Sequence, residues 1–446
     1  MKVSVLVIVL AACGGGMGPG DDVPPNHVTP MLIATGGVAD APLSGELHVY
    51  AVETGTSTPI SGATIRVETA TPLTGQTDAT GLASFTDGAL SGAVTITATA
   101  PGHAATTWIG AAGANVTLPL DKTPRTIPTA HVTGTIAGWN NLSNPPLGKY
   151  NLGVILYSFL DDPAAPENSI AQPMNGTTPL NTCINTGLSN TCSFEMNARI
   201  GKQIHTAVIV QGDPHGTNND TSDDTYTLIG YAAGSVMTLT DGQQVTNESL
   251  AMVTTTTPLT ITFPAAPAGL PSTIAIPELA LDGDAGRIVF PLPTVSPSHT
   301  SATVLAPTGT FAGHYELVAL ATPSITATSP YATSFTHDVS GSATIPAWLA
   351  APTAVQAGAT FSFTAPGATF VSAQIIRGTQ PLWNITILDG TSSFSLPTLT
   401  PDPIGAGSAT FSVNAADAPG FDAKHFNVAS STGALARVAG AQASLH

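Results

Sequence analysis

The stretch PISGATIRVETA, residues 59–70, decides the fold class of this chain. Its apolar side chains Ala63, Ile65 and Val67 stand at every second position, and polar side chains fill the positions between them. Because successive side chains of a β-strand point to opposite faces, a period of two predicts a strand with one buried face. GAVTITATAPGH, residues 92–103, repeats the pattern, so we expect its apolar side chains to point inward and its threonines outward.

The composition of the whole chain favours many short strands. Among its 446 residues there are 44 Gly and 37 Pro, but Lys and Arg together number only 11. The β-branched residues Thr and Val, which are abundant here, suit strands, and Gly and Pro mark the turns between them. We therefore expect an all-β protein, and a chain of this length predicts two to four domains.

The charge pattern excludes two classes of protein. Only 9% of the residues are charged, the formal net charge is −17, and the mean hydropathy is +0.24. A disordered chain is usually poor in apolar residues and rich in charge, so we expect a folded protein. An acidic chain repels phosphate backbones, so we do not expect nucleic acid as a partner.

The first residues carry a targeting signal. VLVIVL, residues 5–10, is an apolar run far shorter than the roughly 20 residues that span a bilayer, which indicates a signal peptide rather than an anchor. LAAC, residues 10–13, then resembles the lipobox of bacterial lipoproteins, in which cleavage directly precedes the cysteine. The resemblance implies a signal peptide over residues 1–12 and lipidation of Cys13. The alternative is an ordinary signal peptide that is cut near Ala12.

A glycine-rich stretch follows this cysteine, and we expect residues 13–43 to form a flexible tether. Lipidation of Cys13 would hold the chain on a membrane without a transmembrane helix. Gly14 after the cysteine resembles an outer-membrane address. The expected location is therefore the bacterial outer membrane or the cell surface, with a periplasmic orientation as the alternative.

Residues 44–122 resemble the carboxypeptidase regulatory-like domain. The residues that carry this resemblance are Pro59, Gly62, Ala63, the turn TDATG at residues 77–81, and Gly102 after the alternating strand. His103 departs from the family pattern, which often has an aromatic residue there. The resemblance implies a transthyretin-like, seven-stranded sandwich that serves as a non-catalytic scaffold or binding module.

Further strand patterns predict a tandem array of β-sandwiches, immunoglobulin-like or transthyretin-like. The linker TPRTIPTA and the tract TTTTP separate these patterns, and a break near PAWLAAP divides the last stretch. The expected domains after the first are residues 127–254, 258–345 and 350–446.

Two cysteines remain after the first, in NTCINTGLSNTCSF. In an exported protein Cys183 and Cys192 are expected to form a disulfide, and the short segment between them resembles a hairpin loop. The loop is small, so we expect about 2–3 kcal/mol of stabilisation. A thiol metal site is the alternative, but it lacks further cysteine ligands and a nearby histidine.

The loop GDPHGTNNDTSDD is a candidate calcium site. Asp213, Asp220, Asp223 and Asp224 offer the oxygen ligands that Ca²⁺ prefers. The alternative is a solvated surface loop, because loops collect Asp and Asn for turn chemistry alone. We expect no other cofactor.

Two further patterns leave alternatives open. His314 and Glu316 lie two apart on an expected strand, so they share a face that is either a zinc site lacking its third ligand or a polar strand face. The four tryptophans, Trp108, Trp139, Trp348 and Trp383, number about one for each expected domain, and they either fill sandwich cores or stack on sugar rings. Their distribution favours the cores.

These features predict a non-catalytic, lipid-anchored envelope or cell-surface protein that displays β-sandwich binding or scaffold domains. A protein or glycan ligand and the membrane are its expected partners. The first alternative is a carbohydrate-binding lipoprotein that captures polysaccharide. The second is a hydrolase whose active site is assembled from distant loops, because the chain has neither H-E-x-x-H nor G-x-S-x-G.

Overall fold

The computed structural model describes residues 36–54, 58–124, 128–158, 182–185, 191–216, 225–253, 256–281, 286–289, 301–307, 313–323, 330–357, 359–378, 380–427 and 435–445. Within these ranges the chain is built of β-strands, and the one helix is a short 3₁₀ turn, η1 (Trp139–Asn141). The expected all-β class is confirmed. No helix in the described ranges has the length and apolar character needed to cross a membrane.

The first sandwich pairs a five-stranded sheet with one end of a twelve-stranded sheet. The five-stranded sheet has the order β31-β1-β8-β2-β5. Its strands are β1 (Gly37–Ala39), β2 (Ser44–Glu53), β5 (Leu82–Ser91), β8 (Asn115–Leu120) and β31 (Phe426–Asn427). Because β31 comes from the other end of the sequence, the first sandwich includes a late segment of the chain.

The twelve-stranded sheet runs through most of the molecule, in the order β20-β19-β22-β23-β32-β30-β27-β28-β7-β6-β3-β4. Its early strands are β3 (Thr64–Glu68), β4 (Leu73–Gln76), β6 (Val94–Thr99) and β7 (Ala105–Ala111). Its middle strands are β19 (Ser272–Leu281), β20 (Arg287–Val289), β22 (Gly313–Thr322) and β23 (Tyr331–Val339). Its late strands are β27 (Phe370–Arg377), β28 (Gln380–Ile387), β30 (Ala409–Asp417) and β32 (Arg437–Leu445).

Two ladders of this sheet join segments that we expected to lie in different domains. β7 pairs in parallel with β28, and β32 pairs with both β30 and β23. The sheet is therefore continuous across the expected boundaries near residues 122 and 350. The division into domains itself stays a prediction.

A seven-stranded sheet takes all of its strands from one stretch of the chain, in the order β11-β10-β14-β15-β17-β9-β12. The strands are β9 (Thr129–Ala137), β10 (Tyr150–Tyr157), β11 (Thr182–Asn185), β12 (Ser193–Arg199), β14 (His205–Asp213), β15 (Thr225–Ala233) and β17 (Gln244–Val253). β10 and β11 lie close to β12 across the sheet, so the sheet folds over on itself. One apolar cluster, which includes Val132, Ile155 and Met196, fills the space between its halves.

Three smaller sheets complete the fold. They are β13-β16, β21-β18-β24 and β25-β26-β29. Their strands are β13 (Gly201–Gln203), β16 (Met237–Leu239), β18 (Thr256–Thr262), β21 (Ser301–Pro307), β24 (Ser342–Thr344), β25 (Thr353–Ala357), β26 (Thr360–Thr364) and β29 (Ser393–Ser395).

The alternation that decided the fold class is present, with one departure. Ile65 and Val67 are buried as expected, and Asp78 accepts the amides of Thr80 and Leu82 in the expected turn. The threonines of β6 were expected to point outward, but Thr97 is buried and hydrogen-bonded to the hydroxyl of Thr107, at 2.8 Å. The core of the last sandwich extends over this side of β7, so Thr97 of β6 is buried there, while Thr95 and Thr99 are half-buried.

Neighbouring sandwiches occupy opposite faces of the twelve-stranded sheet. Over β3, β6 and β7, the face that carries Trp108 packs against the five-stranded sheet. Over β27, β28 and β30, the opposite face carries Trp383 and Phe411 and packs against the sheet of β25, β26 and β29. Among the described residues, neither of these two apolar clusters includes the polar side chains that continue the Trp108 face onto β28, β27, β30 and β32.

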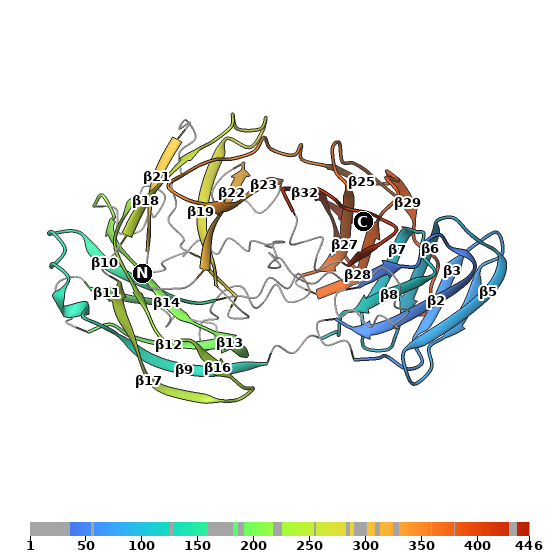
Figure 1. Cartoon of the computed structure of the whole chain (residues 1–446), viewed down its shortest axis with the longest axis horizontal. Helices are drawn as coiled ribbons and strands as arrows, with labels where there is room; N and C mark the ends of the chain where they lie inside the picture. The colour runs from blue at the N-terminus through green and yellow to red at the C-terminus, as the bar shows by residue number, and fades with distance from the viewer. Residues whose placement is uncertain are drawn as a thin grey trace.

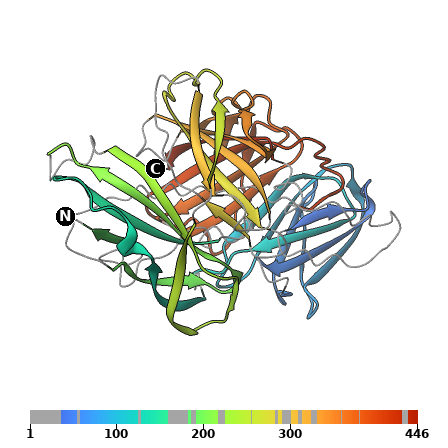
Figure 2. The same ribbon diagram turned by 60° about the vertical axis from the view of Figure 1, so that its left-hand side comes forward.

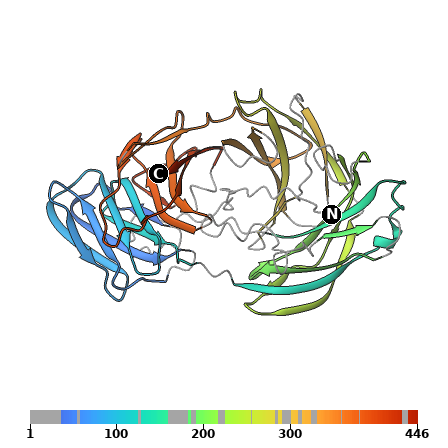
Figure 3. The same cartoon turned by 180° about the vertical axis from the view of Figure 1, so that it is seen from behind.

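The described strands run around a ring-like crescent, and the late strands return to the first sandwich. In Figure 1 the first sandwich (blue) and the last strands (orange and red) lie side by side, with the seven-stranded sheet (green) opposite them. Figure 3 shows the same neighbourhood from behind, and Figure 2 shows the curved seven-stranded sheet beside the strands of the long sheet. The β7–β28 ladder accounts for this closure.

Candidate functional site

Several residues predicted from the sequence fall outside the described ranges. They are Cys13, Asp220, Asp223 and Asp224. Lipidation of Cys13 therefore stays a prediction, and so does calcium binding by the three aspartates.

The remaining acidic residue of that loop has partners within the chain. Asp213 ends β14, forms an ion pair with Lys149 at 2.9 Å and accepts the amide of His215 at 3.0 Å. Its pKa is lowered, first by the bond from Lys149 and then by the amide of His215. These bonds give Asp213 a structural role in its turn. Among the described residues, no group of three or more His, Cys, Asp or Glu is placed to hold a metal ion.

The two later cysteines do not flank a hairpin. Cys183 lies on β11 and Cys192 directly precedes β12, and these strands are the two opposite edges of the seven-stranded sheet. The expected hairpin was wrong because each strand pairs with a different partner, β11 with β10 and β12 with β9. Cys192 is buried in the core of this sheet, and its pairing with Cys183 stays a prediction.

Glu316, on β22, contacts two histidines. His314 is on the same strand, and His337 is on the neighbouring strand β23. Oε1 of Glu316 lies 3.0 Å from Nδ1 of His337 and 3.3 Å from Nε2 of His314. The other ring nitrogen of His337 lies 3.4 Å from the carbonyl oxygen of Leu435, so it meets backbone rather than a hydroxyl or thiol. These contacts give the buried carboxylate polar partners, and a carboxylate is costly to bury without them. They favour the polar strand face over a zinc site.

The tryptophans fill cores, as their distribution favoured. Trp108, Trp139 and Trp383 are each no more than 2% exposed. Trp348 is half-buried and packs between two apolar clusters. The three buried rings are therefore out of reach of a sugar ligand.

A buried polar network crosses the seven-stranded sheet. Arg199 donates to the carbonyl oxygens of Ser158, at 2.6 Å, and Ile200, at 3.0 Å, and burial lowers its pKa to about 10. Gln203 donates its amide to the carbonyl of Arg199. This hydrogen bond orients the side-chain amide so that its oxygen faces His205.

His205 extends this network to Glu248 on β17. Its Nε2 lies 3.2 Å from Gln203 Oε1, and its Nδ1 lies 2.6 Å from Glu248 Oε2. The ring is thus held between Gln203 and the Glu248 carboxylate. The network is enclosed, since His205 is 0% exposed, and its role is to hold β14 against β17.

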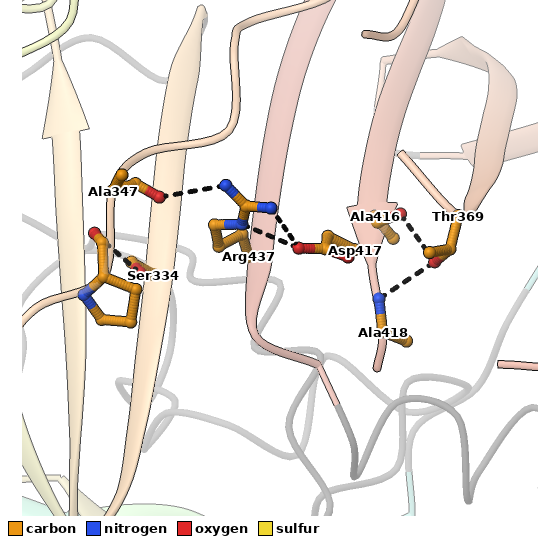
Figure 4. A network of polar contacts seen from close by, with 8 residues as sticks. Ser334, Ala347, Thr369, Ala416, Asp417, Ala418 and Arg437 are labelled. Atoms are coloured by element: carbon orange, nitrogen blue, oxygen red, sulfur yellow. Dashed lines mark hydrogen bonds and ion pairs between the residues drawn. The ribbon is translucent and has the colours of Figure 1, made fainter. Parts of the chain in front are cut away.

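A second polar network holds the middle strands to the late strands (Figure 4). Nε of Arg437, on β32, donates to Oδ2 of Asp417 at 2.8 Å, and Nη2 donates to the same oxygen. Nη1 reaches the carbonyl oxygen of Ala347 at 3.4 Å, and Ser334 bonds the carbonyl of Pro346 nearby. The segment that enters the last sandwich is thereby tied to the C-terminal strand.

The same face of the late strands carries a packed apolar row, which includes Phe370, Ala416 and Val438, and beside it polar, uncharged side chains. Facing residues of paired strands lie on the same side of a sheet, so the ladders define two rows. One row is Asn384, Gln374, Ser412 and Gln442, and the other is Thr386, Ser372, Asn414, Gly440 and Tyr331. We call the polar members of these rows the amide face. At the usual strand spacing, the first row spans about 14 Å.

The amide face is held in place by its own hydrogen bonds. Gln374 Nε2 donates to Asn384 Oδ1 at 3.0 Å, and Asn384 Nδ2 donates to Asp121 Oδ2 at 2.9 Å. The hydroxyl of Tyr331 donates to Asn414 Oδ1 at 2.8 Å. The Tyr331 ring lies where a side chain at position 440 would be, since a Cβ on Gly440 would meet the ring at 2.3 Å.

Sequence reasoning missed the amide face. Its signal is present in the strands VSAQII, WNITI, TFSVN and GAQAS, where small or amide side chains alternate with apolar ones. Each strand alone reads as an ordinary half-buried strand. Only the order β28-β27-β30-β32 places the amides side by side.

Comparison with known proteins identifies no family. No family model matches the chain, and no curated protein sequence matches it. The Bacillus anthracis TIE protein is 10% identical over 63% of this chain and 45% of its own length, with a TM-score of 0.15. The chain thus spans less than half of that protein.

Two pilus proteins give similarly remote likenesses. The full-length major pilin SpaD from Corynebacterium diphtheriae is 12% identical over 63% of this chain and 87% of the pilin, with a TM-score of 0.15. The pilus adhesin SpaC from Lactobacillus rhamnosus GG is 10% identical over 77% of this chain and 43% of the adhesin, with a TM-score of 0.16. Likenesses with such scores carry no argument about function. The all-β fold rests on the strands themselves, and the resemblance to the carboxypeptidase regulatory-like domain stays a prediction.

Proposed function

We propose that this chain is a non-catalytic, lipid-anchored protein of the bacterial envelope or cell surface, and that its joined β-sandwiches are a rigid scaffold for binding. The observation that carries the proposal is the continuity of the twelve-stranded sheet from β4 to β20. Separate domains on linkers would move independently. Shared ladders instead hold a binding surface at a fixed position relative to the tether.

The membrane end of the proposal rests on the lipobox-like LAAC at residues 10–13 and the glycine-rich tether after it. A single acyl chain binds a membrane only marginally, and further chains make the anchor stable. Multiple acylation of Cys13 would therefore keep the scaffold on the membrane without any other contact.

The test is fractionation of host cells that express Cys13→Ser. We expect the variant in the soluble fraction and the parent chain in the membrane fraction. Gly15→Ser, which leaves the cysteine in place, is the matched control and should stay with membranes. Retention of Cys13→Ser in the membrane fraction would refute the anchor. Protease shaving of intact cells then separates a cell-surface orientation from a periplasmic one.

The amide face favours a second, narrower function, which is capture of carbohydrate. Amide and hydroxyl side chains on a rigid sheet suit the hydrogen-bonding groups of sugars.

A further inference from the structure

We propose that the amide face binds an uncharged polysaccharide, laid across β28, β27, β30 and β32. This inference rests on the proposed role of the chain as a displayed scaffold. It names the surface and the chemical class of its ligand, and it does not involve the 213–224 loop or the buried tryptophans.

The first argument is the hydrogen-bonding capacity of the face. The carboxylate of Asp121 orients the Asn384 amide, and Asn384 in turn orients Gln374. Each amide still has unused capacity, because an amide has two N–H donors and an oxygen with two lone pairs. Groups that both donate and accept, held in a row, match the neighbouring hydroxyls of a sugar chain. Since their orientation is already fixed, little entropy is lost when a ligand binds.

The second argument is the aromatic group beside these amides. Gly440 leaves room for the Tyr331 ring, and Asn414 holds its hydroxyl. The ring is half-buried and lies next to the polar rows. Sugars present apolar C–H faces as well as hydroxyls, and an aromatic ring next to hydrogen-bonding groups accommodates both.

The third argument is charge. None of the side chains of the amide face is charged, although the chain carries a net charge of −17. A nucleic acid or an acidic polysaccharide would need cations that the face does not offer. A protein partner would need an apolar centre to its interface, whereas the side chains of these rows are polar apart from the Tyr331 ring. An uncharged polysaccharide is the ligand that remains.

The test is native affinity electrophoresis of the purified full-length chain in detergent, with dextran, mannan or laminarin in the gel. Alginate serves as the acidic comparison. We expect at least one neutral polysaccharide to retard the chain and alginate to leave it unaffected. Gln442→Ala should weaken retention about three- to tenfold, as expected for one or two lost hydrogen bonds. Tyr331→Ala should weaken it further, and Tyr331→Phe less than Tyr331→Ala.

The matched control is Gln380→Ala, an exposed amide on β28 outside both rows, which should bind as the parent does. Circular dichroism of each variant checks that it is folded. The inference is overturned if no neutral polysaccharide retards the chain, if alginate binds equally well, or if Gln442→Ala and Tyr331→Ala bind like the parent. Self-association of the chain that these same variants abolish would assign the face to a second copy. None of these outcomes affects the proposed anchor, which Cys13→Ser tests separately.

Discussion

The seven-stranded sheet and the twelve-stranded sheet are built in opposite ways. Every strand of the first comes from Thr129–Val253, and its core lies largely between its own folded-over halves. The second is assembled from three segments far apart in the chain, and its two faces are covered by different partners. The first is therefore stabilised mainly by contacts within one stretch, whereas the continuity of the second also needs the return of the C-terminal segment to the N-terminal one.

This difference predicts which parts of the molecule unfold together. Damage to the seven-stranded sheet should remain mostly within it, although Leu279 and Ile288 of β19 and β20 pack on its outer side. Damage at the β7–β28 ladder should loosen both the first and the last sandwich, because they share that ladder. Four predictions follow this contrast, in order of decreasing effect.

The largest effect is expected at Trp383. The ring is buried in the last sandwich, and its Nε1 donates to Thr107 Oγ1 across the β7–β28 ladder at 2.8 Å. Trp383→Ala removes a large core side chain and this hydrogen bond, so we expect a loss of about 3–5 kcal/mol in unfolding free energy. Chemical denaturation measures the loss, and hydrogen exchange should show faster exchange in β6 and β7 as well as in β27 and β30.

Trp139→Ala is the comparison for this variant. Trp139 is equally buried, but in the core of the seven-stranded sheet. Its loss should be of similar size, with faster exchange restricted to residues 129–253. If Trp383→Ala leaves the exchange of β6 and β7 unchanged, the two sandwiches are not one cooperative unit.

The second effect concerns the predicted disulfide. A bond between Cys183 and Cys192 would join the two edges of the seven-stranded sheet where the sheet folds over on itself. The double variant Cys183→Ser with Cys192→Ser should lower the unfolding free energy by about 2–3 kcal/mol, the value for so short a loop. Mass spectrometry of unreduced peptides checks the pairing directly, and two free thiols in the exported protein would contradict it.

The third effect is expected at the network of Figure 4. Arg437 bonds Asp417 through two nitrogens and also reaches Ala347. Arg437→Ala should lower the unfolding free energy by only about 1 kcal/mol, because the Arg437–Asp417 pair is partly exposed to solvent. Arg66→Ala is the control, since Arg66 pairs with Glu68 within one strand and joins no separate segments. Equal losses in the two variants would argue against a joining role for Arg437.

The smallest effect is a pH dependence at His131, on β9. Hydrogen bonds raise its pKa, first the one to Gln244 on β17 and then the one to Glu195 on β12. A histidine whose pKa is higher in the folded state stabilises fully below its unfolded value of about 6.5, and this contribution is lost as the pH rises through the folded value. His131→Gln should therefore destabilise the protein more at pH 5 than at pH 9.

The check for this variant is the denaturation midpoint at both values of pH. His425→Gln is the control, because His425 is more than half exposed and solvent weakens its pairing. A larger effect of His131→Gln at pH 9 than at pH 5 would reverse the predicted sign.

Local pattern predicted the strands well. The alternation in PISGATIRVETA and the turn around Asp78 are both present in β3 and the loop before β5. The sequence failed where a strand acquires a second buried face, as Thr97 does, and where a short segment between cysteines suggested a hairpin. In both cases the missing information was the partner strand, which lies far away in the sequence.

The sequence by itself determined the all-β class, the positions of turns, the burial of most tryptophans and the features that indicate a lipid anchor. These follow from side-chain period, residue composition and short motifs, which act over a few residues. Only the tertiary structure decided that the late strands lie between β7 and β23, that the cysteine strands occupy opposite edges, and that four amides share one face. Strand order depends on contacts between distant segments, and a pattern that repeats every two residues carries no record of which neighbour each strand will find.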